Sequence, residues 1–416
     1  MEEEIKEIAK KAKSASTFTA KLSSSIKNQA LQKIADELVD NASFLKEENK
    51  KDLDRAKKEG LSPAMIDRLT LSDKVIEDMA TGLKEVSFLP DPVGEVTKMW
   101  RRPNNLLVGK MRIPIGVIGI IYESRPNVTA DAAGICLKSG NAVILRGGHE
   151  AINSNIAIGK ITAKALNSCG IPSDAVQIIP FTSHEAVNIM LKQEDYIDLI
   201  IPRGGEGLIR NVVKNSRIPV IKHYKGVCHI FVDEYVSFKM AEDIIVNSKT
   251  QRPGVCNALE TLLVHKNISK EFLPLIAESL KKKGVEIRGC KKTKNILQDI
   301  KDAEESDWYE EYLDLILSIK VVKDIDEAIS HILQYGSSHT DAIITQNYNN
   351  AQKFLKEVTS SVVLVNASTR FNDGNQLGLG AEIGISTTKL HAFGPMSIYE
   401  LTTTKFIVYG DGQIRK

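Results

Sequence analysis

The chain has 416 residues, of which 42% are hydrophobic and 26% are charged, a composition typical of a soluble globular protein. Its 55 lysines and arginines are balanced by 53 aspartates and glutamates, so it lacks the basic excess of a nucleic-acid-binding protein. A chain of this length can form two or three domains with a large core and needs no disulfide or metal to fold. We therefore expect a small-molecule partner.

The cysteines and the N-terminal segment indicate the compartment. Five scattered cysteines lack the close Cys and His spacing of a zinc site: Cys136, Cys169, Cys228, Cys256 and Cys290. Residues 1–16 are charged from the second position and contain no apolar segment, and no apolar run reaches the ~20 residues of a membrane span. The sequence predicts a cytoplasmic protein in a reducing environment, without signal peptide or membrane anchor.

Residues up to about 85 have helical periodicity, with lysines and glutamates interleaved on the solvated side. Residues 95–113 are predicted to form two short strands around the turn at Arg102–Asn105, whose Pro-Asn-Asn sequence favours a turn. This hairpin has no obvious partner nearby in the sequence.

Short apolar runs then alternate with helical patterns, which is typical of parallel sheets covered on both faces. The first set of predicted strands comprises residues 115–121, 141–146, 176–180, 196–201 and 218–222. The second set comprises residues 229–233, 259–265, 315–322, 341–346 and 361–366. We expect two α/β domains of a nucleotide-binding type, divided near residue 225.

Polar and glycine-rich loops follow several of these strands. Residues 202–207 (PRGGEG) lead from a strand into a helix, where glycines let the backbone approach a phosphate, although an ordinary turn is equally compatible. Residues 122–132 and 366–374 follow strands, and their polar side chains either bind ligands at the carboxyl ends or form turns. Residues 378–384 have glycine spacing but no preceding strand, so we do not interpret them as a dinucleotide site.

Cys256 lies between a Pro-Gly pair and an apolar run, where a cysteine is either a nucleophile or a small buried plug. No histidine adjoins it in sequence, but a partner needs only to be close in space, so a cysteine hydrolase stays open. Arg252 is a candidate for electrostatic activation of the thiol or an ordinary exposed arginine.

Six segments together resemble the γ-glutamyl phosphate reductase family of the aldehyde dehydrogenase superfamily: YESRPNVT, NAVILRGG, HYKGVCHIFVD, QRPGVCNALET, GLGAEIGIST and KLHAFGPM. The resemblance covers essentially the whole chain. One departure is Phe393, where the family usually has arginine, so no role is transferred to that position.

The resemblance implies an α/β, aldehyde dehydrogenase-like fold with two Rossmann-like parallel-sheet domains and a small β oligomerisation element. The implied boundaries are 1–94 and 114–225 for cofactor binding, 226–393 for catalysis, and 95–113 with 394–416 for oligomerisation. The implied activity is NADPH-dependent reduction of L-γ-glutamyl 5-phosphate to the 5-semialdehyde through a cysteine thioester, a step of proline biosynthesis. It also implies a homo-oligomer and a functional association with glutamate 5-kinase.

The family's functional residues can be transferred where the motifs match. Cys256 is the implied nucleophile, and Asn127 is the implied side-chain donor to the substrate oxygen. For NADPH or NADP the implied contacts are Arg146, Gly204, Gly205 and Glu311. For the substrate they are Arg125, His223 and Arg370, and which anion each arginine binds stays open. No metal is implied.

His223 stands where hydrolytic members of the superfamily have the glutamate that activates water, which suits a reductase that must not hydrolyse its thioester. Two further readings are an oxidising aldehyde dehydrogenase and a non-catalytic ligand sensor. A sensor needs neither Cys256 nor Asn127, so both residues favour an enzyme.

Overall fold

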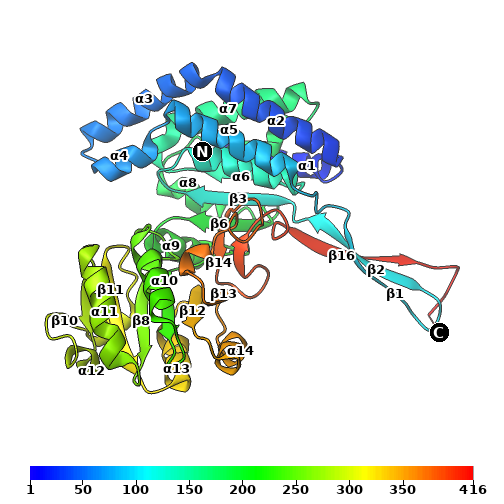
Figure 1. The fold of residues 1–416 in the computed structure, drawn as a ribbon. Helices are drawn as coiled ribbons and strands as arrows, with labels where there is room; N and C mark the ends of the chain where they lie inside the picture. Colours follow the sequence, from blue (N-terminus) through cyan, green and yellow to red (C-terminus); the bar gives the residue numbers. More distant parts are fainter. Residues whose placement is uncertain (416) are drawn as a thin grey trace. The chain divides into compact units, whose positions relative to one another are not determined.

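The computed structural model describes residues 1–415, which form two compact units. Unit 1 comprises residues 1–222, 379–384 and 396–416, and unit 2 comprises residues 223–378 and 385–395. Figure 1 shows the elements of each unit. Unit 1 thus includes residues from both ends of the chain, whereas unit 2 is almost continuous.

Unit 1 begins with a layer of helices: α1 (Glu2–Thr19), α2 (Ser24–Asp40), α3 (Ala42–Lys58), α4 (Pro63–Leu69) and α5 (Asp73–Phe88). Serines begin three of them, because the side chains of Ser23, Ser62 and Ser72 accept hydrogen bonds from main-chain N–H groups of the first turn. The helical periodicity of the first 85 residues is therefore correctly interpreted.

The sheet of unit 1 has four parallel strands in the order β5-β4-β3-β6. Their bounds are β3 (Val117–Tyr122), β4 (Ala142–Arg146), β5 (Val176–Ile178) and β6 (Leu199–Arg203). The intervening helices are α6 (Asn127–Lys138), α7 (Ile152–Ser168), α8 (His184–Met190) and α9 (Glu206–Asn215), with short 3-10 turns at His149–Ala151 and Ser173–Ala175. Ile5 of α1 and Val187 of α8 pack with Val117 and Ile144 in one core cluster, and α6 and α7 contact the strands as well.

One predicted strand, residues 218–222, is wrong as a full strand. Only an isolated parallel bridge joins Ile200 and Val220. Pro219 interrupts the segment, since its nitrogen cannot donate to a ladder, although its carbonyl accepts from the Ile200 N–H at 2.9 Å.

A separate three-stranded antiparallel sheet contains the predicted hairpin: β1 (Val96–Arg101), β2 (Leu107–Pro114) and β16 (Thr402–Tyr409), in the order β1-β2-β16. Gly109 of the central strand leaves room for Met99 and Ile407 on either side. The ring of Trp100 meets that of Phe406 edge to face, with 6.3 Å between centroids. The unpartnered hairpin thus pairs with the last strand of the chain.

Unit 2 contains a seven-stranded parallel sheet in the order β10-β9-β11-β8-β7-β12-β13. Its strands are β7 (Cys228–Val232), β8 (Leu259–His265), β9 (Glu286–Gly289), β10 (Lys301–Asp302), β11 (Ile316–Val322), β12 (Thr340–Ile344) and β13 (Val362–Val365). All five predicted strands are confirmed. The two that sequence reasoning missed, β9 and β10, are short and lie at the sheet edge.

The helices of unit 2 are α10 (Phe238–Thr250), α11 (Ser269–Lys282), α12 (Lys291–Lys294), α13 (Ile325–Tyr335) and α14 (Tyr348–Glu357), with 3-10 turns at Glu305–Tyr309 and Thr369–Phe371. Ile245 and Leu273 pack in one core cluster, and Ile329 and Phe354 pack in a second. A further strand pair consists of β14 (Gly384–Ser386) and β15 (Gly394–Met396). Among residues 1–415, no helix is both long and apolar enough to cross a membrane.

Candidate active site

In unit 1, the five predicted site residues follow or end three neighbouring parallel strands. Arg125 and Asn127 follow β3, Arg146 ends β4, and Gly204 and Gly205 follow β6. Since β4, β3 and β6 are adjacent and parallel, these residues gather at one edge of the sheet, the carboxyl edge.

Asn127 begins α6, and its side-chain amide donates a hydrogen bond to Asp131 Oδ2 at 3.2 Å, one turn further along the helix. Burial raises the pKa of Asp131 to about 6, although the bond from Asn127 opposes this shift. A side-chain amide has two hydrogens, so Asp131 can orient Asn127 without using both. Sequence reasoning missed Asp131, although its spacing of four residues from Asn127 is a usable signal.

Gly205 is the N-cap residue of α9, which has no side-chain cap. The Gly205 N–H donates to Glu123 Oε2 at 3.0 Å, and a Cβ on Gly204 would stand 2.5 Å from the Glu123 carboxyl carbon. A carboxylate therefore occupies the position that a helix N-terminus offers to an anion. Around Gly205 itself nothing lies within 4 Å of a built Cβ, so the main chain is open to a ligand there.

Arg146 is only 7% exposed. Its Nη2 donates to the main-chain carbonyls of Thr182 at 2.6 Å and Ser183 at 3.2 Å, while its buried Nε has no hydrogen-bond acceptor among the described residues. Burial lowers the pKa of this guanidinium, whereas Glu150 and Tyr122 oppose the shift. The arginine thus has a fixed position and an unused donor.

In unit 2 the loops that contain Cys256 and the residues near it come directly before strands of the sheet. Gly226 precedes β7, Cys256 precedes β8, Glu311 precedes β11 and His339 precedes β12. Because all these strands are parallel, the loops meet at the amino edge of the sheet. In unit 1, in contrast, the predicted residues gather at the carboxyl edge of their own sheet.

Gly226 holds the Cys256 main chain in place by direct contact. A Cβ built on Gly226 would lie 1.9 Å from the Cys256 carbonyl oxygen, so no side chain fits without moving the cysteine. The Gly226 N–H in turn donates to Glu311 Oε1 at 2.9 Å. The structure thereby brings Glu311 and Cys256 to the same loop cluster, with Gly226 between them.

A second contact to Cys256 comes from Cys228, which is fully buried and whose thiol donates to the Cys256 carbonyl at 3.1 Å. Its Sγ also lies 3.8 Å from Nδ1 of His339. The His339 ring meets that of His223 edge to face at 5.7 Å, and burial lowers the pKa of His339 to about 3. His223 therefore contacts His339, which in turn lies beside Cys228.

Arg370 lies close to the Cys256 loop. The expectation that it lies at the carboxyl end of the preceding strand is wrong. The sequence places it at the carboxyl end of β13, but the chain turns back, and Arg370 Nε donates to Gln251 Oε1 at 2.9 Å, just before the Cys256 loop. Burial lowers the pKa of Arg370 and Arg252 lowers it further, while Asp373 and the thiols of Cys256 and Cys228 oppose this. The guanidinium charge is thus within electrostatic reach of Cys256.

The other polar residues of this segment serve the fold. The Asn366 side chain bonds both main-chain groups of Thr345 at 2.8 Å, and the buried Asn372 donates to Thr340 Oγ1 at 2.6 Å. Asp373 accepts from the N–H of Asn375 at 3.0 Å. The turn interpretation fits Asp373, whose acceptor bond is local, whereas Asn366 and Asn372 join this segment to residues 21 and 32 positions away in the chain.

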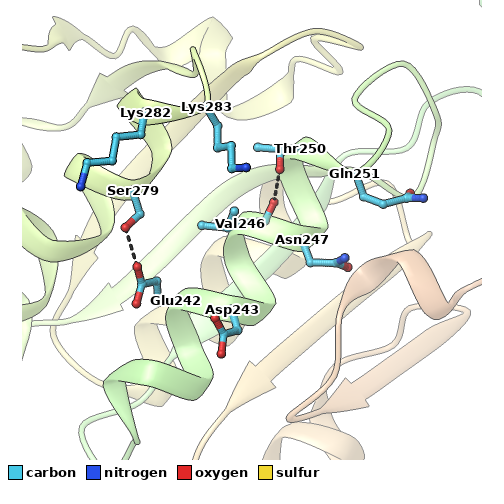
Figure 2. A pocket seen from close by; sticks show the side chains of 9 residues that line it. All are labelled: Glu242, Asp243, Val246, Asn247, Thr250, Gln251, Ser279, Lys282 and Lys283. Carbon is cyan, nitrogen blue, oxygen red and sulfur yellow. Dashed lines mark hydrogen bonds between the residues drawn. The ribbon is translucent and has the colours of Figure 1, made fainter.

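A surface pocket of about 580 Å³ lies beside α10 in unit 2. Figure 2 shows Ser279 donating to Glu242, with Lys282 and Lys283 on the facing helix. None of the predicted site residues lines this pocket, although Gln251, which holds Arg370, stands at its edge.

Three comparisons place the chain among known proteins. The model of the aldehyde dehydrogenase family matches residues 1–294. A γ-glutamyl phosphate reductase of Geotalea daltonii is 62% identical over 414 residues, which cover 100% of this chain and 99% of that protein. The crystal structure of the γ-glutamyl phosphate reductase of Thermotoga maritima is 49% identical, with a TM-score of 0.98 over 99% of this chain and 100% of that one.

A more distant structure shares the fold alone. An engineered glycolyl-CoA reductase with bound NADP⁺ is 17% identical, with a TM-score of 0.68 over 97% of this chain and 96% of that one. Together with the full-length relatives, it confirms the two-sheet α/β architecture. The chain belongs to the aldehyde dehydrogenase family of oxidoreductases and, within it, to the γ-glutamyl phosphate reductases.

Proposed function

We propose that this enzyme reduces L-γ-glutamyl 5-phosphate to L-glutamate 5-semialdehyde and phosphate with NADPH, the second step of proline biosynthesis from glutamate. The observation that carries the proposal is the fixed main chain of Cys256, held by Gly226 and by the Cys228 thiol, in a chain whose full-length relatives are γ-glutamyl phosphate reductases.

Cys256 is the proposed nucleophile. Its thiolate attacks the γ-carbonyl carbon of the acyl phosphate, a carbon–sulfur bond forms, and the carbon–oxygen bond to phosphate breaks with the electron pair leaving on phosphate. Reduction of the resulting thioester gives a hemithioacetal, which expels the Cys256 thiolate and releases the aldehyde. This covalent route replaces one difficult step by easier ones.

Negative charge develops on the substrate oxygen in both halves of the reaction, so hydrogen-bond donors are required there. The proposed donors are the Cys256 main-chain N–H and the side-chain amide of Asn127. Support for Asn127 comes from Asp131, which accepts from the amide and thereby limits its rotation.

The residues of unit 1 fit an anionic dinucleotide. Gly205 leaves open main chain at a helix N-terminus that already attracts a carboxylate, and Arg146 has a buried Nε donor without an acceptor. We propose that Gly204 and Gly205 hold the pyrophosphate of NADPH and that Arg146 holds ribose hydroxyls or the 2′-phosphate. When bound, the reduced nicotinamide supplies the hydride for the thioester.

Glu311 remains the proposed ligand of the nicotinamide ribose. One of its oxygens accepts from Gly226, and a carboxylate can accept several hydrogen bonds at once. The same side chain would then connect the cofactor with the Cys256 loop.

Arg125, Arg370 and His223 are the proposed contacts of the substrate's anionic groups. The electrostatic coupling of Arg370 to Cys256 supports Arg370 as the residue that binds an anionic group next to the reacting carbonyl. Arg125 follows β3 at the edge that carries Asn127, which supports a similar role.

The decisive assay runs in reverse: NADPH formation from NADP⁺ by the purified protein with L-glutamate 5-semialdehyde, with and without inorganic phosphate. We expect phosphate-dependent formation that Cys256→Ser lowers on the order of a thousandfold or more. Cys290→Ser is the matched control and should retain activity, because Cys290 lies against Thr293 at the far end of β9. Phosphate-independent turnover, or a Cys256→Ser variant within tenfold of the parent, contradicts the mechanism.

We also propose that the sheet β1-β2-β16 joins identical subunits. Its surface carries large apolar side chains that the rest of unit 1 does not cover, including Met99, Phe406, Val408 and Tyr409, which are 41%, 64%, 56% and 59% exposed. A second copy of the chain is the proposed occupant of this surface.

A further inference from the structure

Unit 2 contains a fully buried ion pair close to the Cys256 loop. Lys249 lies in the last turn of α10, and Glu260 lies in β8, four residues after Cys256. Lys249 Nζ and Glu260 Oε2 are 2.6 Å apart, and both side chains are 0% exposed. Removing one partner of such a pair leaves an uncompensated charge in the interior, whereas an apolar pair of similar volume is often tolerated.

The second oxygen of Glu260 has a different partner. Glu260 Oε1 accepts from the main-chain N–H of Leu313 at 3.4 Å. Leu313 has φ of +53°, a left-handed conformation that is unfavourable for a residue with a side chain. Its side chain is 47% exposed, so burial of that side chain does not explain the conformation. A main-chain contact must therefore contribute to holding it.

The two residues before Leu313 are anchored separately. Tyr312 bonds through its hydroxyl to Asp307 Oδ1 and Ser318 Oγ, both at 2.7 Å. Glu311 accepts from the Gly226 N–H at 2.9 Å. Three consecutive residues thus have three separate hydrogen-bonded attachments. Leu313 is attached to Glu260 itself, and Lys249 Nζ also lies 5.9 Å from the centre of the Tyr312 ring.

The segment Glu311–Leu313 contacts the Cys256 loop by two routes. Glu311 binds the N–H of Gly226, whose Cα packs directly on the Cys256 main chain. The Leu313 carbonyl lies 3.6 Å from the Cβ position of Gly254, two residues before the cysteine. A displacement of residues 311–313 would consequently change the position of Cys256.

We propose that Lys249 and Glu260 are positioning residues: Glu260 holds the strained Leu313 of the Glu311–Leu313 segment, the segment holds Gly226, and Gly226 sets the place of the Cys256 main chain. This inference rests on the proposed role of Cys256 as nucleophile. Lys249 favours the charged form of Glu260, since it opposes the burial that raises the pKa of Glu260 to about 7.

The test separates positioning from stability with two double variants that differ only at position 260, where one side chain keeps an oxygen acceptor for the Leu313 N–H and the other does not. Lys249→Met with Glu260→Gln removes both charges and keeps a side-chain oxygen for the Leu313 N–H. Lys249→Met with Glu260→Met removes the charges and the acceptor. The readouts are the thermal midpoint, the single-turnover rate of phosphate release from γ-glutamyl phosphate, and the rate of Cys256 alkylation by iodoacetamide across pH.

We expect similar thermal midpoints for both double variants. Phosphate release should stay within about threefold of the parent in the Gln variant and fall at least about tenfold in the Met variant, because small misplacement of a nucleophile is costly. Lys27→Met with Asp91→Leu removes another ion pair, in unit 1 at 2.9 Å, whose lysine is buried and whose aspartate is 12% exposed, and should leave both rates unchanged. Equal rates in the two double variants overturn the proposal.

Two further outcomes are informative. If the Met variant does not fold, Glu260→Gln alone decides: it keeps the acceptor, so a lower thermal midpoint with a rate within about threefold supports positioning, and a tenfold loss of rate overturns it. If the parent releases no phosphate, the proposed function fails, while iodoacetamide alkylation still reports whether the pair positions Cys256.

Discussion

Gly226 and Cys256 are in main-chain contact: a Cβ on Gly226 would stand 1.9 Å from the carbonyl oxygen and 2.7 Å from the Cα of Cys256. Gly226 is not among the residues of positive φ, so space and not backbone conformation requires glycine here. The contact places the main chain that carries the proposed nucleophile under the control of a residue in another loop.

Gly226→Ala should therefore lower kcat/KM for γ-glutamyl phosphate by about a hundredfold, since the methyl group must displace the Cys256 main chain. Gly254→Ala is the matched change in the same loop, where the added Cβ meets only the Leu313 carbonyl at an ordinary 3.6 Å, and it should cost much less. Steady-state kinetics of both variants checks this, and equal losses would show that the contact is not specific.

Asp131→Ala should lower kcat about tenfold, because Asn127 loses the acceptor that orients its amide; removing an oxyanion donor itself typically costs ~10²–10³-fold. Asp131→Asn keeps an acceptor and should cost less. As pH falls through about 6, Asp131 becomes protonated and accepts more weakly, so the parent rate should decline there. That inflection should be absent from the pH profile of Asp131→Asn, and its persistence would assign it to another group.

Acid should destabilise unit 2 through His331, which is buried and whose pKa is lowered from 6.5 to about 2, chiefly by burial. Below pH 6.5 the unfolded chain takes up a proton that the folded histidine does not, so stability is full above 6.5 and is lost as pH falls toward 2. At pH 5.5 the loss from this one residue is about 1.4 kcal/mol.

His331→Phe keeps an aromatic ring beside Trp308 and Tyr335 and should remove this part of the pH dependence. Denaturant unfolding at pH 7.5 and 5.5 gives the comparison, with the exposed His184→Phe as the control that should leave the difference between the two pH values unchanged. An unchanged difference in His331→Phe would show that His331 is protonated in the folded protein.

Phe406→Lys with Val408→Lys should dissociate the proposed oligomer. Both exposed side chains point to the same face of β16, so two charges would enter the interface. Thr403→Lys adds a charge to the same strand at an exposed polar position on the opposite face and should be tolerated better. Light scattering gives the molar mass of each variant. A parent protein that is already monomeric refutes the assignment of the sheet to assembly.

The strands of the two main sheets could be predicted because parallel strands buried on both faces are almost continuous apolar runs. The edge strand β10 and its short neighbour β9 could not, since β10 is the exposed pair Lys301–Asp302 and carries no apolar signal. Residues 218–222 are apolar yet form only a bridge, because Pro219 limits pairing. Composition thus predicts the interior of a sheet better than its margins.

The residues of the candidate site could be predicted from the sequence only in part. Cys256 and Asn127 could be chosen from motif resemblance, and the spacing of four residues between Asn127 and Asp131 is a local signal as well. Cys228 and Gly226, in contrast, act on Cys256 through contacts that no local pattern reports. The ion pair of Lys249 and Glu260 joins a helix to a strand, and nothing in either segment reveals the pairing. Side chains that position others are determined by the packing of distant segments.

The sheet β1-β2-β16 has a consequence for the order in which the protein is made. Arg112 of β2 donates to the Thr402 hydroxyl across a separation of 290 residues, and all of β16 pairs along β2. During translation, β2 therefore leaves the ribosome with one edge open, and that edge stays unpaired until residues 402–409 have been synthesised. Unit 2 can complete its sheet in the meantime. Because β1 pairs with the other edge of β2, it cannot cover the open edge, and the nascent chain is expected to depend on chaperones to shield it.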